Sequence, residues 1–387
     1  MQRGIETGGR CDGPGIYVHI PFCRRKCPYC DFVSGPHDHG VCAPYIQAVC
    51  REATLRSAQV SSLCFQTLYV GGGTPSLLAS HALRPLLETL RSVFHWHERP
   101  EATIEVNPDS ASLEWMGACR DMGINRISIG VQSLSDAGLH VLGRLHDTVQ
   151  ALNACEMARA VGFDAVSVDL IYGWPGQTLK DLMQELNLLL ALAPDHISCY
   201  QLTLEPGTPM ERMYRDGLLP VIEEDIVLQL TDYMEDFLMS HGYNLYEISN
   251  FARPGFECRH NLNYWSNGEY LGLGCAAVSF LNGERISNTA DFTQYLNSIA
   301  DGLLPVAEVE CLNEEAHFRE TMMLGLRRAN GISISGMETR FHINPLRYYG
   351  DTLYSLMDMG LVTLKNDRLF LSRTGRRLAN QVFMRLI

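Results

Sequence analysis

The chain has no apolar run of about 18 residues, the length that a membrane-spanning helix needs. Residues 1–15 are polar and glycine-rich, and they lack the apolar core of a secretory signal. We therefore expect a flexible tail at residues 1–15 and no transmembrane segment. Peripheral contact of the folded protein with a membrane stays open.

Basic clusters are also scarce. The formal net charge is −13, and the longest basic block consists of Arg24, Arg25 and Lys26. Phosphate backbones are bound by concentrated positive charge, so we exclude nucleic acid as a main partner.

A paired cysteine framework is missing as well. The 13 cysteines are odd in number and scattered, and most lie in apolar segments, as Cys199 does. Secreted domains stapled by disulfides have even, regularly spaced cysteines. We expect reduced thiols and a cytoplasmic protein.

Short apolar runs alternate with amphipathic segments from residue 16 onward. Strands are expected at residues 16–20, 67–70, 103–106, 126–130, 165–170 and 196–202. Helices are expected between them at residues 43–56, 83–94, 113–122, 149–161 and 179–192. Most of these strands lack strict polar alternation, which favours burial on both faces. Repeated β–α units predict an α/β fold with a parallel sheet, and six units suit a partial barrel rather than a closed eight-unit barrel.

The pattern changes after about residue 205. A helix is expected at 221–240, a strand at 243–248 and a polar run of turns at 249–268. Further helices at 314–326, 334–340 and 345–359, followed by hairpin strands at 361–364 and 369–371, predict a module like a winged helix. Its arginines 373, 376 and 377 are interpreted as a solvent-exposed face. The expected divisions are 1–15, 16–248, 249–310 and 311–387.

Three cysteines close together, Cys23, Cys27 and Cys30, stand at the spacing C-x₃-C-x₂-C. Thiolates suit both zinc and iron–sulfur clusters. Structural zinc normally takes four protein ligands in paired arrangements, whereas this loop offers three. A cluster of four irons would keep one iron open for another ligand. A structural zinc knuckle is the alternative.

Polar groups and glycines follow the first five expected strands. The cysteine loop follows the first strand, Gly71–Gly73 the second, and Glu105, Gln132 and Asp169 stand at the ends of the next three. In parallel β/α folds the carboxyl ends of strands build the active site. We therefore expect these groups to meet at one edge of the sheet.

The cysteine loop resembles that of radical S-adenosylmethionine (SAM) enzymes. Together with Gly71–Pro75, Glu105–Pro108, Gly130–Gln132 and Asp169–Pro175, it is similar to the oxygen-independent coproporphyrinogen III oxidase (HemN) family. This resemblance implies a partial barrel that binds a [4Fe–4S] cluster through the three cysteines, and SAM, with an electron donor as partner. It implies SAM contacts at Tyr17, Tyr29, Gly72, Gly73, Thr74 and Glu105, and matches second-SAM positions of the oxidase at Gln132, Arg144 and Asp169.

Two departures from the oxidase pattern favour the heme-chaperone branch, HemW. Phe32 stands where the oxidase has a further cysteine, and the segment before the cysteine loop is shorter than in the oxidase. The H-N-x-x-Y-W element at residues 260–265 also resembles that branch, which implies a heme site at His260, Tyr264 and Trp265 and an unidentified heme-accepting protein. The alternatives are a histidine bonded within its loop beside a tryptophan anchor, and an oxidase that decarboxylates two propionates.

Overall fold

The centre of the molecule is a sheet whose six parallel strands follow the predicted order. The computed structural model describes residues 13–36, 39–221 and 223–387, so residues 1–12 of the expected tail lie outside the described residues. The six neighbouring parallel strands are β1 (Gly15–Ile20), β4 (Cys64–Gly72), β5 (His95–Val106), β6 (Arg126–Gln132), β7 (Ala165–Tyr172) and β8 (His196–Gln201). The prediction of a partial six-unit barrel is confirmed.

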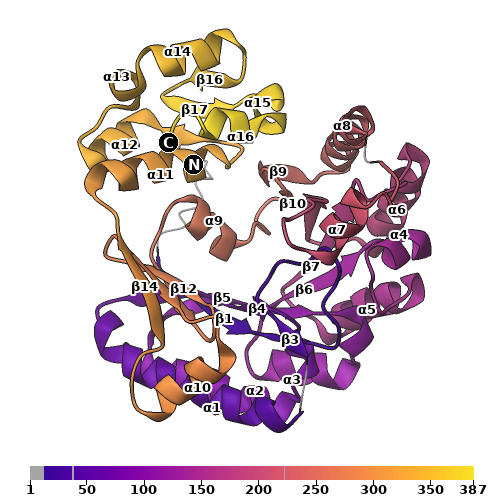
Figure 1. The fold of residues 1–387 in the computed structure, drawn as a ribbon, viewed down its shortest axis with the longest axis vertical. Coiled ribbons are helices and arrows are strands. Elements are labelled where there is room, and N and C mark those ends of the chain that lie inside the picture. The colour runs from indigo at the N-terminus through magenta and orange to yellow at the C-terminus, as the bar shows by residue number, and fades with distance from the viewer. Residues whose placement is uncertain (1–12, 37–38, 222) are drawn as a thin grey trace, which may run out of the picture.

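Helices cover the outer face of this sheet (Figure 1). They are α1 (His39–Arg56), α2 (Ser80–Val93), α3 (Leu113–Asp121), α4 (Asp136–Val141), α5 (Thr148–Val161) and α6 (Leu179–Leu192). Outward strand residues such as Val18, Ile104 and Ile127 are fully buried beneath them. The inward positions of β6 and β7 are polar instead, with Arg126 and Asp169 lining a cavity. The expectation of strands that are apolar on both faces is therefore wrong for the inner face, because a cavity and not a packed core lies there.

Further strands extend the sheet at both ends. The end beyond β8 carries β10 (Asn250–Ala252) and β9 (Asn244–Glu247). The end beyond β1 carries β11 (Tyr270–Leu273), β12 (Val278–Leu281), β13 (Glu284–Asn288) and β14 (Val306–Cys311). β11 runs parallel to β1, and helix α10 (Phe292–Ala300) packs on α1. The four strands between residues 270 and 311 are thus part of the barrel sheet.

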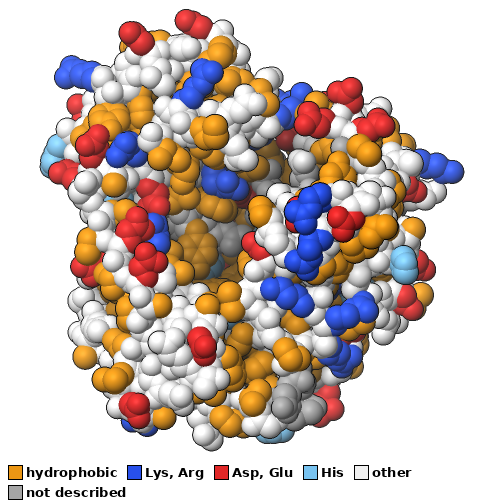
Figure 2. All heavy atoms as spheres, in the orientation of Figure 1, with side chains coloured by type: hydrophobic (Ala, Val, Ile, Leu, Met, Phe, Trp, Pro, Cys, Tyr) orange, Lys and Arg blue, Asp and Glu red, His pale blue; other side chains and the backbone are white. Residues whose placement is uncertain are grey.

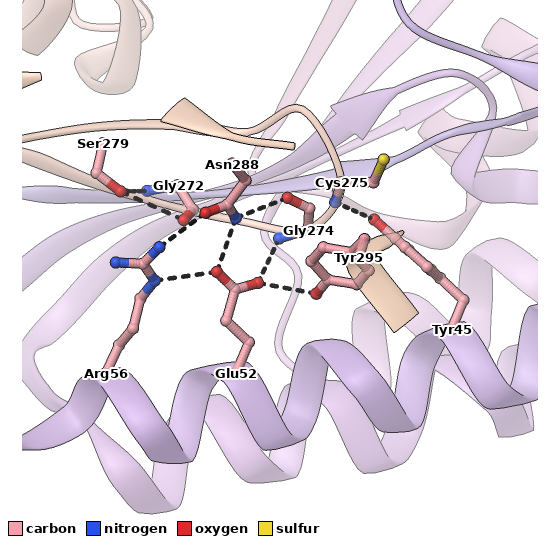
Figure 3. A network of polar contacts seen from close by, with 9 residues as sticks. All are labelled: Tyr45, Glu52, Arg56, Gly272, Gly274, Cys275, Ser279, Asn288 and Tyr295. Atoms are coloured by element: carbon pink, nitrogen blue, oxygen red, sulfur yellow. Dashed lines mark hydrogen bonds and ion pairs between the residues drawn. The ribbon is translucent and has the colours of Figure 1, made fainter. Parts of the chain in front are cut away.

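A buried polar network joins α1 to this late segment (Figure 3). The Glu52 carboxylate accepts hydrogen bonds from Arg56 Nε at 2.9 Å, Asn288 Nδ2 at 2.7 Å, Gly274 N at 2.8 Å and Tyr295 Oη at 2.8 Å. A buried charge is tolerated only when it is paired and hydrogen-bonded. Glu52 meets both conditions, so it ties α1 to residues 274–295.

The C-terminal module has its own hydrophobic core, centred on Phe318, Leu353 and Leu369. Its elements are α11 (Glu314–Leu326), β15 (Ile332–Ser333), α12 (Ile334–Phe341), α13 (Pro345–Tyr349), α14 (Asp351–Asp358), β16 (Val362–Lys365), β17 (Arg368–Leu371), α15 (Arg373–Arg377) and α16 (Ala379–Phe383). The single helix expected at 345–359 is divided at Gly350, whose φ of +46° does not fit a right-handed helix.

Ion pairs hold this module against α8 (Glu224–Ser240). Arg373 Nη1 lies 2.8 Å from Asp236 Oδ1, and Arg376 Nη2 lies 3.0 Å from Glu235 Oε2. Arg377 pairs with Asp232. The interpretation of these arginines as a solvated face is therefore wrong, because α8 presents a matching row of carboxylates.

The stretch expected as turns at 249–268 contains β10 and a short helix, α9 (Arg259–Trp265). Within the described ranges, no helix combines the length and the apolar character needed to cross a membrane.

Candidate functional site

The three clustered cysteines line one end of a cavity of about 450 Å³ inside the partial barrel. All three are half-buried free thiols, and a turn with Cys30 N donating to Cys27 O at 3.1 Å shapes the loop. The loop follows β1 at the carboxyl ends of the parallel strands, as predicted. The side chains therefore converge where ligands of β/α folds bind.

Two donors face the cysteine sulfurs. Arg144 Nη1 donates to Cys27 Sγ at 3.4 Å, and Thr74 Oγ1 donates to Cys23 Sγ at 3.7 Å. Arg144 is held in place by Asn107 Oδ1 at 2.8 Å and Gly130 O at 3.0 Å. Both donors therefore point at sulfurs that, as metal ligands, would carry negative charge.

This arrangement suits a cluster with three protein ligands. Cys258 also lines the cavity, but its Sγ donates to Glu101 Oε1 at 3.6 Å. Glu101 pairs with Thr67 toward the amino ends of the parallel strands, whereas the cysteine loop lies at their carboxyl ends. In the described part of the chain, no three His, Cys, Asp or Glu side chains are grouped to hold a single metal ion. The zinc alternative gains no support from these residues.

The glycines at and directly after the end of β4 bring backbone close to this cavity. Gly72 has φ +110°, and a Cβ there would lie 2.3 Å from His19 Nδ1. A Cβ at Gly73 would lie 2.6 Å from Phe22 O. Only glycine fits both positions, and Gly72, Gly73 and Thr74 all line the cavity.

Glu105 stands beside these glycines at the end of β5. Its Oε2 accepts from Gly72 N at 3.0 Å, and its Oε1 accepts from Tyr69 Oη at 2.9 Å. Burial, reinforced by the nearby Asp169 carboxylate, raises the pKa of Glu105 to about 7. A carboxyl group poised at this pKa can take up or release a proton when a cationic ligand arrives.

The remaining residues predicted for SAM divide between two places. Tyr29, Gln132, Arg144 and Asp169 line the cavity with the cysteines. Asp169 accepts from Ser128 Oγ at 3.1 Å, and burial raises its pKa. Tyr17 borders a second cavity instead.

Helix α9 closes the floor of the barrel and contains the H-N-x-x-Y-W element. His260 is 1% exposed, its Nδ1 lies 2.8 Å from Thr67 Oγ1, and its Nε2 lies 3.0 Å from Tyr264 Oη. Burial lowers the pKa of His260 to about 3, so the imidazole is neutral. Both ring nitrogens already have partners, and neither faces open space in this arrangement.

The second cavity, of about 530 Å³, lies between the barrel and the C-terminal module. Figure 2 shows that face of the molecule hollowed beneath the module. The cavity is walled by aromatic side chains, namely Tyr17, Phe32, Tyr264, Trp265, Tyr270 and Phe280. Arg285 and Glu320 are charged groups in its wall. Asp31 and Phe32 border both cavities, so the second cavity adjoins the cysteine loop.

Several cavity residues were missed at the sequence level. Tyr69, Thr103, Arg126 and Ser128 line the first cavity, and His19 lines the second. The available signal was a period of two in which every second residue from Arg126 to Gln132 faces inward. This signal identifies a lumen only once strand direction and barrel curvature are known.

Comparisons with known proteins agree with this geometry. A family model described as the radical SAM superfamily matches residues 17–189, and one for the HemN C-terminal domain matches residues 312–378. Proteins named heme chaperone HemW are similar: that of Lactococcus lactis is 34% identical, covering 96% of each chain, and that of Bacillus subtilis is 33% identical, covering 95% of this chain and 97% of its own. HemW of Escherichia coli is 37% identical over 71% of this chain and 72% of its own.

The solved structure of coproporphyrinogen III oxidase (HemN) from Escherichia coli is also similar. It has a TM-score of 0.85 and 25% identity, and the match covers 97% of this chain and 90% of that chain. Radical SAM proteins carry a [4Fe–4S] cluster and SAM, which is the pair of cofactors that the cysteine loop and its cavity fit. From the identity to HemW proteins along nearly its whole length, the chain belongs to the HemW family of radical SAM proteins.

Proposed function

We propose that this protein is a heme chaperone that holds a [4Fe–4S] cluster and SAM in the barrel, binds heme in the second cavity and passes the heme to an acceptor protein. The observation that carries the proposal is the second cavity, whose wall combines Tyr264 and Trp265 with aromatic residues from the barrel.

In this proposal Cys23, Cys27 and Cys30 ligate the cluster, which when bound supplies an electron to SAM. Arg144 and Thr74 stabilise the thiolates through the contacts already described. Glu105 would accept a hydrogen bond from the SAM ammonium or ribose, and Gly72 and Gly73 line the same cavity without side chains.

Heme suits the second cavity on chemical grounds. A porphyrin is a flat apolar disc with two carboxylates on one edge. Tyr264, Trp265 and Phe280 offer aromatic surface. Arg285 lies in the same wall and is ion-paired with Glu310 at 2.7 Å and with Glu320, so a propionate would bind it by replacing one of these carboxylates. Trp265 Nε1 is buried without a hydrogen-bond partner among the described residues, so it is a further donor for a ligand in this cavity.

His260 can bind heme iron only after Tyr264 moves. Tyr264 lines the cavity and covers His260 Nε2, which makes Tyr264 the side chain that must turn aside before iron reaches His260. Imidazole is a common axial ligand of heme iron. We propose that heme binding replaces the His260–Tyr264 hydrogen bond with an iron–nitrogen bond.

An anaerobic coproporphyrinogen III oxidase is the second candidate. It is supported by Gln132, Arg144 and Asp169, which line the first cavity as the oxidase resemblance implies. The chain departs from the oxidase pattern at Phe32, so we favour the chaperone.

Heme titration of the anaerobically reconstituted protein tests the proposal. Wild type should give a saturable Soret band, His260→Ala a shifted band and weaker retention, and Trp265→Ala weaker retention alone. His241→Ala is the matched control, since His241 is exposed and is not among the residues that line the cavity. Retention is read as the rate of heme loss to excess apomyoglobin. No saturable binding by wild type, or formation of protoporphyrinogen from coproporphyrinogen III with SAM and a reductant, would overturn it.

A further inference from the structure

The floor of the first cavity carries two neighbouring polar side chains at the end away from the cysteine loop. Thr103 on β5 and Arg126 on β6 are register partners in the parallel sheet. Both side chains line the cavity. Together they form the first register pair between β5 and β6. They belong to neither the cysteine loop nor the glycine segment that the proposed SAM site uses.

Both side chains have unmet hydrogen-bonding capacity. Arg126 is 4% exposed, and its Nη1 donates to Phe256 O at 3.0 Å, but its Nη2 has no partner among the residues that the structure describes. Thr103 is 0% exposed, and its Oγ1 likewise has no partner in the described ranges. Native proteins satisfy nearly all buried polar groups, because each one left unpaired costs roughly 1–3 kcal/mol.

The neighbouring charges narrow the class of ligand. Arg126 makes no ion pair with a carboxylate in the described part of the chain, and Glu101 is occupied by Cys258 Sγ and by the backbone N–H groups of residues 259 and 260. Asp169 lies further along the inner wall and accepts from Ser128. A guanidinium next to a hydroxyl suits a singly charged anion with two oxygens, whereas Asp169 would repel a second negative charge and accept a donor instead.

We infer that the barrel floor is a binding site for a small organic carboxylate, with Arg126 Nη2 and Thr103 Oγ1 donating to its two oxygens. An amine or hydroxyl on the same ligand would reach Asp169. The site lies in the first cavity and not in the proposed heme cavity, so it is independent of heme binding. It assigns this chain a second small-molecule ligand of defined chemistry.

The probes are butyrate and its neutral amide, butyramide, at constant ionic strength. Binding to the full, anaerobically reconstituted chain is measured by ligand-observed saturation-transfer NMR. Butyrate should show a saturable signal and butyramide should not. Arg126→Gln should weaken butyrate at least about tenfold and Thr103→Val about threefold, as expected for the loss of a charged and a neutral donor.

Arg212→Gln is the matched control, because Arg212 is exposed on α7 (Pro209–Arg215) and should leave butyrate binding unchanged. Saturating S-adenosylhomocysteine separates two sources of the carboxylate. Displacement of butyrate assigns the floor to the carboxylate of a SAM-like nucleoside, and simultaneous binding assigns it to a separate acid.

If Arg126→Gln fails to fold, Thr103→Val still tests the inference, since valine matches threonine in shape. Equal signals from butyrate and butyramide, or butyrate binding unchanged in Thr103→Val and in any folded Arg126→Gln, would overturn the inference. In that case ordered water alone satisfies the two donors.

Discussion

The His260 imidazole stacks on the ring of Tyr69, with centroids 5.3 Å apart and planes inclined by 29°. Tyr69 Oη donates to Glu105 in the first cavity, and His260 Nε2 bonds to Tyr264 Oη, which borders the second. A continuous set of side chains therefore connects the proposed SAM site to the proposed heme site. Each end of this set can be tested separately.

Glu105 makes SAM binding dependent on pH. Its pKa of about 7 means that the carboxyl is neutral below pH 7 and charged above it. Cationic SAM favours the charged form, so affinity should rise with pH between about 5.5 and 7.5, approaching tenfold per unit well below the pKa. Anaerobic equilibrium binding checks this, and Glu105→Gln should flatten the profile. An equally steep profile in Glu105→Gln would assign the titration to another group, and Glu308→Gln on exposed β14 is the control.

His260 makes the stability of the fold depend on pH between about pH 3 and pH 6.5. Burial lowers its pKa to about 3, whereas the unfolded chain has the ordinary value of 6.5, so the unfolded state binds more protons between these values. Stability from this group is therefore present above pH 6.5 and is lost as the pH falls toward 3. Urea unfolding at pH 7.5 and 5.5 should show wild type losing about 1 kcal/mol more than His260→Gln. Equal losses would mean that His260 is already accessible to protons in the folded state.

The cysteine loop predicts that Cys23, Cys27 and Cys30 are needed for the iron–sulfur cluster and that cysteines outside the loop are not. Cys23→Ala, Cys27→Ala and Cys30→Ala should each abolish most of the iron–sulfur absorbance after anaerobic reconstitution, because a cluster with three protein ligands has none to spare. Cys64→Ala should retain it, since Cys64 is exposed at the start of β4. Iron and sulfide analysis measures the occupancy. Full occupancy in Cys27→Ala would contradict the ligand assignment.

Replacing Glu52 should lower the free energy of unfolding and leave ligand binding unchanged. Glu52→Ala leaves Arg56 buried without its carboxylate, which typically costs about 3–5 kcal/mol. Chemical unfolding under reducing conditions gives the value, with the exposed Glu308→Ala as a control expected to change stability by less than about 0.5 kcal/mol. A loss below about 1 kcal/mol would mean that water replaces the carboxylate in the network.

Much of the fold was accessible from the sequence. The helix at 179–192 was predicted at its observed limits, Leu179–Leu192, and all six parallel strands were found. Five of them have small errors at their ends, whereas β5 begins at His95, eight residues before the predicted start at 103. Local hydrophobic periodicity determines such elements, and alternating β and α segments require parallel strands. Since parallel strands share one carboxyl edge, the convergence of Cys23, Gly72 and Glu105 followed from the chain order alone.

The tertiary structure decided what depends on residues distant in the chain. β11 joins the sheet beside β1, and α9 closes the barrel floor against β4 and β5. No local pattern encodes that His260 would be buried with both nitrogens bonded. Nor does one encode that Arg126, which lines the first cavity, would have an Nη2 without a partner among the described residues. Burial and hydrogen-bond satisfaction are properties of the packed assembly, so they are determined only when segments from both halves of the chain come together.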